Sequence, residues 1–293
     1  MPSDITLADR RFLTGLIGAP IAHSASPAMH EWAGQALGAK VHYHLIEVAG
    51  ASREELRALF DSVRRLGFAG VNVTFPYKEA AVELLDELSV GAAAMQAVNT
   101  VVVRNGRLIG HNTDATGFAR AARDLVEASS RGAVALIGAG GVGKAIAFAL
   151  AQLGVTDIRV FDTDAAKAAT LARAVGTRST VTIAASVEDA LRGAVGLVNG
   201  TPIGMLPNRN SPVPDALLRS GLWVADAVYS PLWTPLLTAA KARGLQVMTG
   251  RELAIFQAAD AFELFTGLKP SAAEIGKAFD AVMAKRYAAS TAA

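Results

Sequence analysis

Short hydrophobic runs alternate with stretches of helical periodicity along most of the chain. Between residues 41 and 76 this pattern predicts a strand, a helix and a second strand, at 41–48, 52–67 and 71–75. A second series begins near residue 133 and predicts, in chain order, strand 133–137, helix 142–153, strand 158–161, helix 165–175 and strands 197–199, 223–227 and 246–249. Alternation of strands and helices is typical of α/β domains with largely parallel sheets, so the two series predict two lobes.

The last part of the chain has a different pattern. Two helices are predicted at 251–266 and 272–287, with a glycine and a proline between them. Because consecutive helices cannot extend a sheet, we expect them to pack on the first lobe, which would then be discontinuous in sequence. The predicted division is a first segment at 1–114, a second domain at 115–250 and a returning segment at 251–293.

Composition excludes several classes of protein. The 293 residues are 52% hydrophobic and 18% charged, which excludes a disordered or fibrous chain. With 28 basic and 26 acidic residues the net charge is +2 and no basic run occurs, so binding to nucleic acid or to a membrane surface is disfavoured. Two acidic residues precede the apolar segment at 12–21, and glycines and a proline interrupt it, so we do not expect an export signal. A lysine, a glutamine and a cluster of four glycines lie within the apolar segment at 132–155, so we do not expect a membrane helix. The absence of cysteine fits a reducing compartment, and we expect a cytoplasmic protein.

A glycine-rich segment follows the predicted strand 133–137. Gly138, Gly140 and Gly143 form G-x-G-x-x-G at the start of a helix, where the backbone can approach a pyrophosphate at the helix N-terminus. The alternative is a turn that needs glycine only for its own backbone. Asp162 ends the next strand, where a carboxylate can bind a ribose 2′-hydroxyl and would repel a 2′-phosphate. Since the nearest downstream base is Lys167, we predict NAD rather than NADP as the preferred cofactor.

Polar residues gather near the end of the predicted strand 71–75. Alternation places Asn72 and Thr74 on one face, and Lys78 follows just past the strand, where open α/β sheets bind ligands. A single lysine is usually only solvated. Asp114 stands where a helix joining the lobes should start, and the simplest role of an acid there is to cap that helix. The segment 18–27 adds two hydroxyl groups separated by one residue, which suit a carboxylate.

Eight motifs along nearly the whole chain, in this order, resemble those of the shikimate and quinate dehydrogenases. They are GAPIAHSASPAMH at 18–30, NVTFPYK at 72–78, AVNT at 97–100, GHNTD at 110–114, GAGGVG at 138–143, NGTPIGM at 199–205, DAVYSPLWTPLL at 226–237 and QAADAFELFTG at 257–267. Each motif alone is weak, but eight in order are specific. The resemblance implies an N-terminal α/β substrate-binding domain that is completed by the C-terminal helices, and a Rossmann-type dinucleotide-binding domain.

The same resemblance assigns roles to individual residues. It makes Lys78 and Asp114 the catalytic pair, in which Lys78 is the general acid and base. It implies that Ser24 and Ser26 hold the substrate carboxylate. It implies that the ring hydroxyls are oriented by Asn72, Thr74, Asn99, Tyr229 and Gln257. It implies cofactor contacts from Gly138, Ala139, Gly140, Gly141, Val142, Gly143, Asp162, Thr201, Ala227 and Gly250.

The residues support one of these roles independently. On a helix, Gln257 shares an apolar stripe with Leu253, Ala261 and Leu264, and a polar amide in such a stripe needs a partner. That partner could be a backbone carbonyl, but the resemblance favours a substrate hydroxyl.

Three features depart from the biosynthetic shikimate enzymes. Glu31 stands where Asn is more frequent, Gly200 replaces a usual Ala, and Asp162-Thr163 replaces the start of an Asn-Arg-Thr pattern that is typical of NADP enzymes. The last departure is similar to NAD-linked quinate/shikimate enzymes. His42 and His44 share one face of a strand, but no third metal ligand is apparent.

The predicted protein is an NAD-dependent dehydrogenase for shikimate, quinate or a close analogue, with no metal and no thiol in the reaction. Its expected partner is a small-molecule substrate, and we expect a monomer or a homodimer. Three alternatives remain: an NADP-linked biosynthetic shikimate dehydrogenase, an enzyme for an amino analogue of the substrate, and a ligand-sensing protein without turnover.

Overall fold

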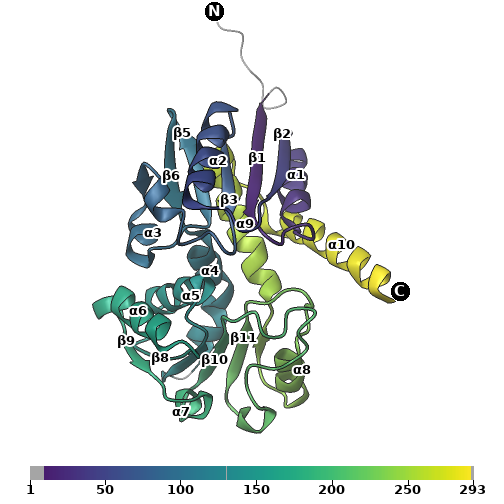
Figure 1. Ribbon diagram of the computed structural model, residues 1–293. Helices are drawn as coiled ribbons and strands as arrows, with labels where there is room; N and C mark the ends of the chain where they lie inside the picture. The colour runs from purple at the N-terminus through teal and green to yellow at the C-terminus, as the bar shows by residue number, and fades with distance from the viewer. Residues whose placement is uncertain (1–9, 130, 292–293) are drawn as a thin grey trace, which may run out of the picture. The chain divides into compact units, whose positions relative to one another are not determined.

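The computed structural model describes residues 10–129 and 131–291, shown as a ribbon in Figure 1. The chain divides into two compact units. Unit 1 comprises Met1–Thr113 and Gln257–Ala293, and unit 2 comprises Asp114–Phe256. Each unit is built on its own six-stranded sheet. The second division falls inside a helix, α9 (Gly250–Thr266), six residues after the predicted domain boundary at 250.

The sheet of unit 1 has the order β2-β1-β3-β5-β6-β4. The strands are β1 (Arg11–Gly18), β2 (Lys40–Glu47), β3 (Gly70–Val73), β4 (Glu87–Leu88), β5 (Thr100–Arg104) and β6 (Arg107–His111). Strands β2 and β3 both lie parallel to β1, as the predicted strand–helix–strand alternation requires. Beyond β3 the sheet becomes mixed, because β5 is antiparallel to both β3 and β6.

Helix α2 (Arg53–Arg65) shows why the first lobe folds as predicted. Ser52 and Glu55 form a capping box, in which each side chain accepts a hydrogen bond from the other residue's backbone N–H. Leu56, Phe60 and Val63 recur at helical spacing and are buried in the core with the sheet. The other helices of the N-terminal segment are α1 (Ser26–Ala36), α3 (Val90–Met95) and a short 3-10 turn, η2 (Val82–Leu84).

The C-terminal helices complete the core of unit 1. Ala261 and Phe265 of α9 pack against Val102 of β5. A Cβ at Gly70 would lie 2.5 Å from the Phe265 ring, so only glycine allows this approach of helix to strand. Helix α10 (Ala272–Thr291) packs on α1, where the indole N–H of Trp32 donates to Glu274 (3.2 Å) (Figure 1).

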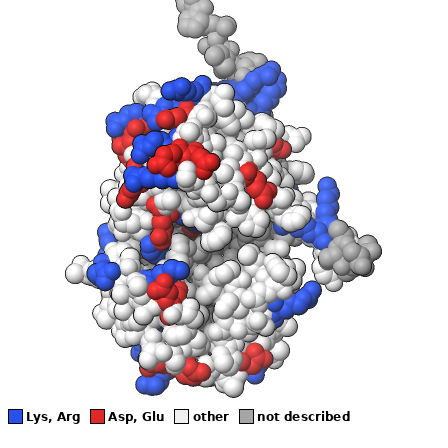
Figure 2. Space-filling model, in the orientation of Figure 1, with Lys and Arg blue, Asp and Glu red and all other residues white. Residues whose placement is uncertain are grey.

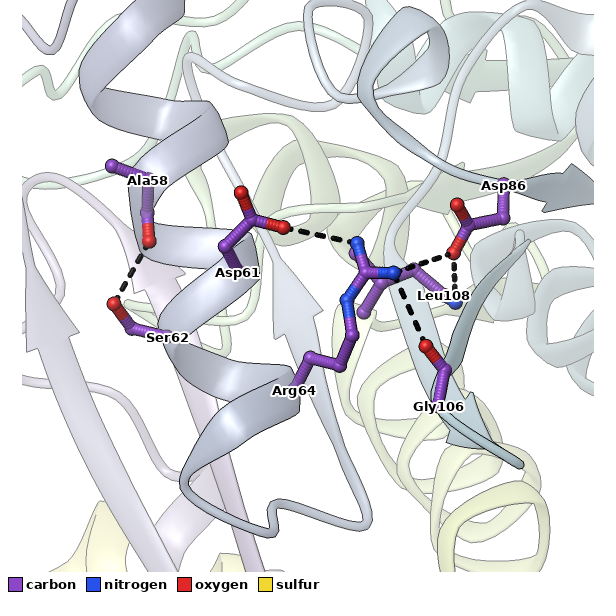
Figure 3. Close-up of polar contacts among 7 residues, drawn as sticks. All are labelled: Ala58, Asp61, Ser62, Arg64, Asp86, Gly106 and Leu108. Carbon is purple, nitrogen blue, oxygen red and sulfur yellow. Dashed lines mark hydrogen bonds and ion pairs between the residues drawn. The ribbon is translucent and has the colours of Figure 1, made fainter.

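Arg64 joins three segments at the edge of the unit 1 sheet (Figure 3). Its guanidinium pairs with Asp61 within α2 (3.0 Å) and with Asp86 before β4 (3.4 Å), and it donates to the carbonyl of Gly106 in the β5–β6 turn (3.1 Å). Asp86 also accepts from the backbone N–H of Leu108 (2.7 Å). Because these side chains are only partly exposed, this network fixes α2 on the β5–β6 hairpin better than an isolated surface ion pair would.

Unit 2 has the order β12-β11-β10-β7-β8-β9, and every strand pair in it is parallel. Read from β9, this is the strand order 3-2-1-4-5-6 of the Rossmann fold, with β7 first in the chain and central in the sheet. The strands are β7 (Val134–Ile137), β8 (Asp157–Phe161), β9 (Thr180–Ile183), β10 (Gly196–Asn199), β11 (Trp223–Asp226) and β12 (Val247–Met248). The helices are α4 (Thr113–Ala128), α5 (Gly141–Gln152), α6 (Ala165–Val175), α7 (Val187–Leu191) and α8 (Pro235–Ala242), and two 3-10 turns are η3 (Gly176–Arg178) and η4 (Asp215–Leu217).

Charges of both signs lie on the face of the molecule in Figure 2. Figure 2 shows acidic and basic side chains intermixed on the face that it draws, without a broad region of one sign. Within the described residues, no helix has the length and apolar character needed to cross a bilayer.

His30 is an unusual buried group in unit 1. Its ring lies on α1 against Tyr43 (centroids 4.5 Å apart), Phe262 and Phe265, and neither ring nitrogen has a hydrogen-bond partner within the described residues. Burial lowers the pKa of His30 from 6.5 to about 3. The ring therefore stays neutral in the folded protein while the unfolded chain binds a proton below pH 6.5.

This difference predicts a pH-dependent stability. As pH falls from 6.5 towards 3, His30 binds a proton in the unfolded chain but not in the folded protein. This group therefore lowers the free energy of unfolding by about 1.4 kcal/mol per pH unit. A His30→Leu variant removes this loss, and its stability relative to the unchanged protein should rise by roughly 2 kcal/mol between pH 6.5 and 5. Urea unfolding at the two pH values measures the difference. His44→Leu, which removes an exposed histidine of the same unit, is the control, and an equal change there would refute the assignment to His30.

Candidate functional site

Three glycines shape the turn between β7 and α5, each for a different physical reason. Gly138 has φ +102°, and a Cβ there would lie 2.7 Å from the Thr201 side chain. A Cβ at Gly143 would lie 2.1 Å from the Gly138 carbonyl oxygen, so glycine allows α5 to begin against the turn. A Cβ at Gly140 would meet nothing within 4 Å. Neighbouring atoms therefore pack closely against Gly138 and Gly143, whereas the space beside Gly140 is open, where a pyrophosphate would need room.

The N-terminus of α5 is suited to an anion. Gly140 is its N-cap and provides no side-chain hydrogen bond, and the first turn contains no acidic residue. The backbone N–H groups of Gly141, Val142 and Gly143 belong to this first turn, where the helix dipole favours negative charge. The turn therefore fits a dinucleotide's pyrophosphate in both shape and electrostatics.

Asp162 lies directly after β8 and holds the glycine-rich turn. Its carboxylate accepts from the backbone N–H of Ala139 (2.7 Å) and from that of Asp164 (2.8 Å). These bonds fix the carboxylate beside the turn, where a ribose would lie if the pyrophosphate were at α5. Lys167 is paired with Asp164 (3.9 Å), and Thr163 is exposed, so the residues next to Asp162 bring no guanidinium to a 2′-phosphate.

A buried polar network joins the loops after β10 and β11. Asn199 donates to Asp226 (2.9 Å) and accepts from both the backbone N–H (3.0 Å) and the hydroxyl (2.7 Å) of Thr201. Asp226 also accepts from the N–H of Val228 (2.9 Å) and the hydroxyl of Thr234 (2.7 Å). Burial raises the pKa of Asp226 to about 6, although the three hydrogen bonds oppose this rise.

This network positions three of the expected cofactor residues. Thr201 lies in the loop after β10, where its N–H donates to Asn199. Ala227 lies between Asp226 and Val228, and the N–H of Val228 donates to Asp226. Gly250 begins α9 against the same loop, because a Cβ there would lie 2.7 Å from the Ala227 carbonyl oxygen and 2.5 Å from that of Val228. Gly200 is tight as well, since a Cβ would lie 3.2 Å from the Cα of Gly143. These loops meet between β7 and β10, where the strand order reverses and Rossmann sheets bind their ligands.

In unit 1, the two serines lie at the start of α1. The hydroxyl of Ser24 donates to that of Ser26 (3.1 Å) and accepts from the backbone N–H of Ser26 (3.2 Å). The first turn of α1 contains no acidic residue. Two adjacent hydroxyls at a helix N-terminus form a neutral donor set that suits a carboxylate.

The loop after β3 lies against the segment that leads to these serines. Ala19 donates its N–H to the carbonyl of Phe75 (3.1 Å), and a Cβ at Gly18 would lie 2.4 Å from the Thr74 side chain. The backbone carbonyl of Lys78 accepts from the N–H of Val98 (2.8 Å), next to Asn99. Thr74 and half-buried Lys78 are thus held between the α1 loop and the start of β5.

Asn72 and Asn99 form one buried cluster with two threonines. Asn72 donates both amide hydrogens, to the backbone carbonyl of Asn99 (3.1 Å) and to the hydroxyl of Thr100 (3.0 Å). The side-chain oxygen of Asn99 accepts from the N–H of Thr113 (2.6 Å) and from the hydroxyl of Thr100 (3.0 Å), and its amide donates to the hydroxyl of Thr113 (3.0 Å). The site residues of β3 and β5 are therefore part of one rigid array.

Three more expected site residues stand on other elements. Asp114 is buried in the first turn of α4 and directly follows Thr113, so its Cα is about 3.8 Å from that of a residue bound to Asn99. Tyr229 follows β11 in unit 2, and Gln257 is the first residue of unit 1 on α9. Lys78 and Asp114 belong to different units, so their catalytic pairing stays a prediction.

The structure adds polar residues that sequence reasoning missed. Tyr43, Thr100, Thr113, Asn199 and Asp226 are buried and orient expected site residues. A signal was present for four of them, because Thr100, Thr113, Asn199 and Asp226 stand inside the motifs AVNT, GHNTD, NGTPIGM and DAVYSPLWTPLL. Tyr43 lies in an ordinary strand pattern and gave no such signal.

In the described part of the chain, no three or more His, Cys, Asp or Glu side chains form a group that could hold a metal ion. His42 and His44 face each other on β2 (ring centroids 6.1 Å apart), and the nearby carboxylate of Glu31 lies 3.5 Å from Nδ1 of His42. Glu31 also accepts from the backbone N–H of Tyr43 (3.0 Å), so this departure from the usual Asn anchors α1 to β2.

Comparison with known proteins agrees with this geometry. The family model described as "Shikimate dehydrogenase substrate binding domain" matches residues 16–101, and the "ThiF family" model matches 112–186, which includes the glycine-rich turn. The quinate/shikimate dehydrogenase (NAD(+)) of Corynebacterium glutamicum (strain R) is 42% identical over 91% of this chain and 97% of its own. The shikimate dehydrogenase (NADP(+)) of Streptomyces avermitilis is 43% identical over 88% of this chain and 91% of its own.

Solved structures give the same result. The quinate dehydrogenase of Corynebacterium glutamicum in complex with NAD superposes with a TM-score of 0.86 at 41% identity, over 93% of this chain and 99% of that one. Both the sequence likeness and the structural likeness therefore extend over both units rather than over one shared domain. This chain belongs to the shikimate and quinate dehydrogenase family.

Proposed function

We propose that this protein is an NAD-dependent quinate/shikimate dehydrogenase, which reversibly oxidises a ring hydroxyl of quinate or shikimate to a ketone. The observation that carries the proposal is the carboxylate of Asp162, fixed beside the glycine-rich turn and followed at 163–166 by no lysine or arginine that could receive a 2′-phosphate. Similarity to NAD-linked quinate/shikimate dehydrogenases at 42% identity supports it.

Unit 2 is the cofactor-binding domain in this proposal. The N–H groups at the start of α5 hold the pyrophosphate, Asp162 binds the ribose hydroxyls, and Thr201, Ala227 and Gly250 bound the rest of the cofactor. Bound NAD supplies the hydride acceptor for oxidation. Unit 1 is the substrate-binding domain, formed by 1–113 and completed by 257–293.

The proposed site residues then have separate roles on the substrate. Ser24 and Ser26 hold the carboxylate, and Asn72, Thr74 and Asn99 orient the ring hydroxyls, with Tyr229 and Gln257 as further contacts. The C–H bond of the reacting carbon breaks with its electron pair leaving as hydride, and the O–H proton passes to Nζ of Lys78. Asp114 orients Lys78 and the reacting oxygen, and reduction reverses both transfers.

A matrix of two substrates and two cofactors tests the proposal. Steady-state kcat/KM for quinate and shikimate, each with NAD and NADP, should be about 10- to 100-fold greater with NAD, because the Asp162 carboxylate repels the 2′-phosphate of NADP. A preference for NADP would instead support a biosynthetic shikimate dehydrogenase. No cofactor reduction with either acid would refute the proposed activity.

The biosynthetic enzyme is the second candidate, and one observation favours it. The NADP-linked shikimate dehydrogenase of Streptomyces avermitilis is as similar in sequence to this chain as the NAD-linked relative is. An enzyme for an amino analogue would reduce the cofactor with that analogue and not with shikimate or quinate. A ligand-sensing protein would bind shikimate without reducing any cofactor. We keep a cytoplasmic location and a monomeric or homodimeric state as predictions.

A further inference from the structure

We infer that Tyr43 is a positioning residue for substrate recognition, because it holds the side chain of Asn72 so that its oxygen, an acceptor, is the group left for the substrate. The inference rests on the proposed function, in which Asn72 contacts a ring hydroxyl. It adds the hydrogen-bond direction of that contact and names the residue that fixes it.

Asn72 has almost no hydrogen-bonding capacity left. An asparagine amide has two donor hydrogens, and Asn72 spends both on Asn99 and Thr100. The Asn99 partner is a backbone carbonyl, which can only accept, so the amide nitrogen must face it. The oxygen of Asn72 then faces Tyr43, whose hydroxyl donates to it at 2.8 Å. One lone pair of that oxygen remains for a ligand.

The Tyr43 ring is held firmly enough for this role. Tyr43 is 3% exposed, and its ring lies against the ring of His30, with centroids 4.5 Å apart and the planes tilted by 36°. The backbone N–H of Tyr43 donates to Glu31, so α1 fixes the tyrosine at both its backbone and its ring. The hydroxyl therefore reaches Asn72 from a fixed point on β2, across β1.

Asn99 has the opposite hydrogen-bonding role to Asn72, because it is left with a donor. Its oxygen is occupied by Thr100 and Thr113, while among the described residues only one of its two amide hydrogens has a partner, the hydroxyl of Thr113. Asn99 can thus donate one hydrogen bond, and Asn72 can accept one. A ligand group at Asn72 must be a donor, such as a hydroxyl or an ammonium group, and a ketone oxygen is excluded there by lone-pair repulsion. The oxygen that becomes a ketone during the reaction therefore does not face Asn72.

The test is a Tyr43→Phe variant assayed with NAD and with quinate or shikimate. Loss of one hydrogen bond to Asn72 should raise KM for the ring substrate about 5-fold, with KM for NAD and kcat within about 2-fold of the unchanged protein. In an Asn72→Ala background the same Tyr43→Phe change should no longer alter KM for the ring substrate, because its effect passes through Asn72.

Thr14→Val is the matched control. Thr14 lies opposite Tyr43 in the β1–β2 register, is fully buried, and donates its hydroxyl to the His42 carbonyl (3.2 Å). Its replacement removes a buried hydroxyl bond from the same strand pair without touching Asn72, so KM for the ring substrate should not change.

Each outcome has one meaning. An unchanged KM in Tyr43→Phe, an equal rise in Thr14→Val, or an undiminished rise in the Asn72→Ala background would overturn the role of Tyr43. If the unchanged protein reduces no cofactor with either acid, the proposed function fails, and that failure is distinct from a failure of the role of Tyr43.

Discussion

Replacement of Lys78 by alanine is expected to lower kcat by about two to four decades, because the proposed acceptor of the hydroxyl proton is then missing. Binding of NAD should be nearly unchanged, since Lys78 lies in unit 1 and the proposed cofactor residues lie in unit 2. Steady-state rates and an NADH fluorescence titration measure the two effects separately.

Two further variants separate proton transfer from charge and from folding. Lys78→Arg keeps the positive charge, but a guanidinium does not lose its proton in proteins, so this variant should be nearly as slow as Lys78→Ala. Lys269→Ala removes an exposed lysine of the same unit and should keep full activity. Near-normal turnover in Lys78→Ala would remove Lys78 from the mechanism.

The second large effect is expected at the end of β8. Asp162→Asn with Thr163→Arg should reverse the cofactor preference and change the NADP/NAD ratio of kcat/KM by about 10³-fold, because a repelling carboxylate is replaced by a guanidinium that can bind a 2′-phosphate. Asp164 remains in this variant and keeps its two hydrogen bonds to the start of α6, to the N–H groups of Ala166 and Lys167. Initial rates at saturating substrate with each cofactor give the ratio.

Asp162→Asn alone is the control for this switch. Asp162 uses one carboxylate oxygen for the N–H of Ala139 and the other for the N–H of Asp164. An asparagine has a single acceptor oxygen, so it cannot accept the two bonds on separate oxygens. Use of NAD should fall about 10-fold while use of NADP should gain little without the arginine. A double variant that still prefers NAD would show that Asp162 does not set the preference.

Much of the fold could be predicted where periodicity and glycines are strong. Helix α6 was predicted at its observed bounds, and β2, β7, β8 and α5 were predicted within one or two residues. These elements have continuous apolar runs or clear helical faces, and glycine or a polar cap marks their ends. The prediction of helices at the C-terminus was also confirmed, with α10 extending to Thr291.

The missed elements have weaker patterns, although some carried a signal. The β5–β6 hairpin turns at Asn105-Gly106, both with positive φ (51° and 74°), and Asn-Gly between apolar runs is a strong hairpin signal. Helix α8 begins at Thr234-Pro235, an N-cap followed by proline, which also marks a helix start. Strand β9 is largely exposed at the sheet edge, so its hydrophobic pattern could not reveal it.

Candidate site residues could be named from motifs, but the hydrogen bonds that join them could not. Motifs located Asn72 and Asn99, yet the direction of their hydrogen bonds depends on Tyr43, which is 29 residues from Asn72 in the chain. Such a contact follows from the order β2-β1-β3 in the sheet, and a strand order is not encoded in local periodicity.

The discontinuity of unit 1 has a consequence for synthesis on the ribosome. Unit 2 is continuous in sequence and can bury its core as soon as its last strand has been made. Unit 1 begins first, but His30 and Gly70 remain without Phe262 and Phe265 until α9 has been translated. The part of the protein that leaves the ribosome first is therefore the part that finishes folding last, and during that interval a chaperone would find its apolar surface exposed.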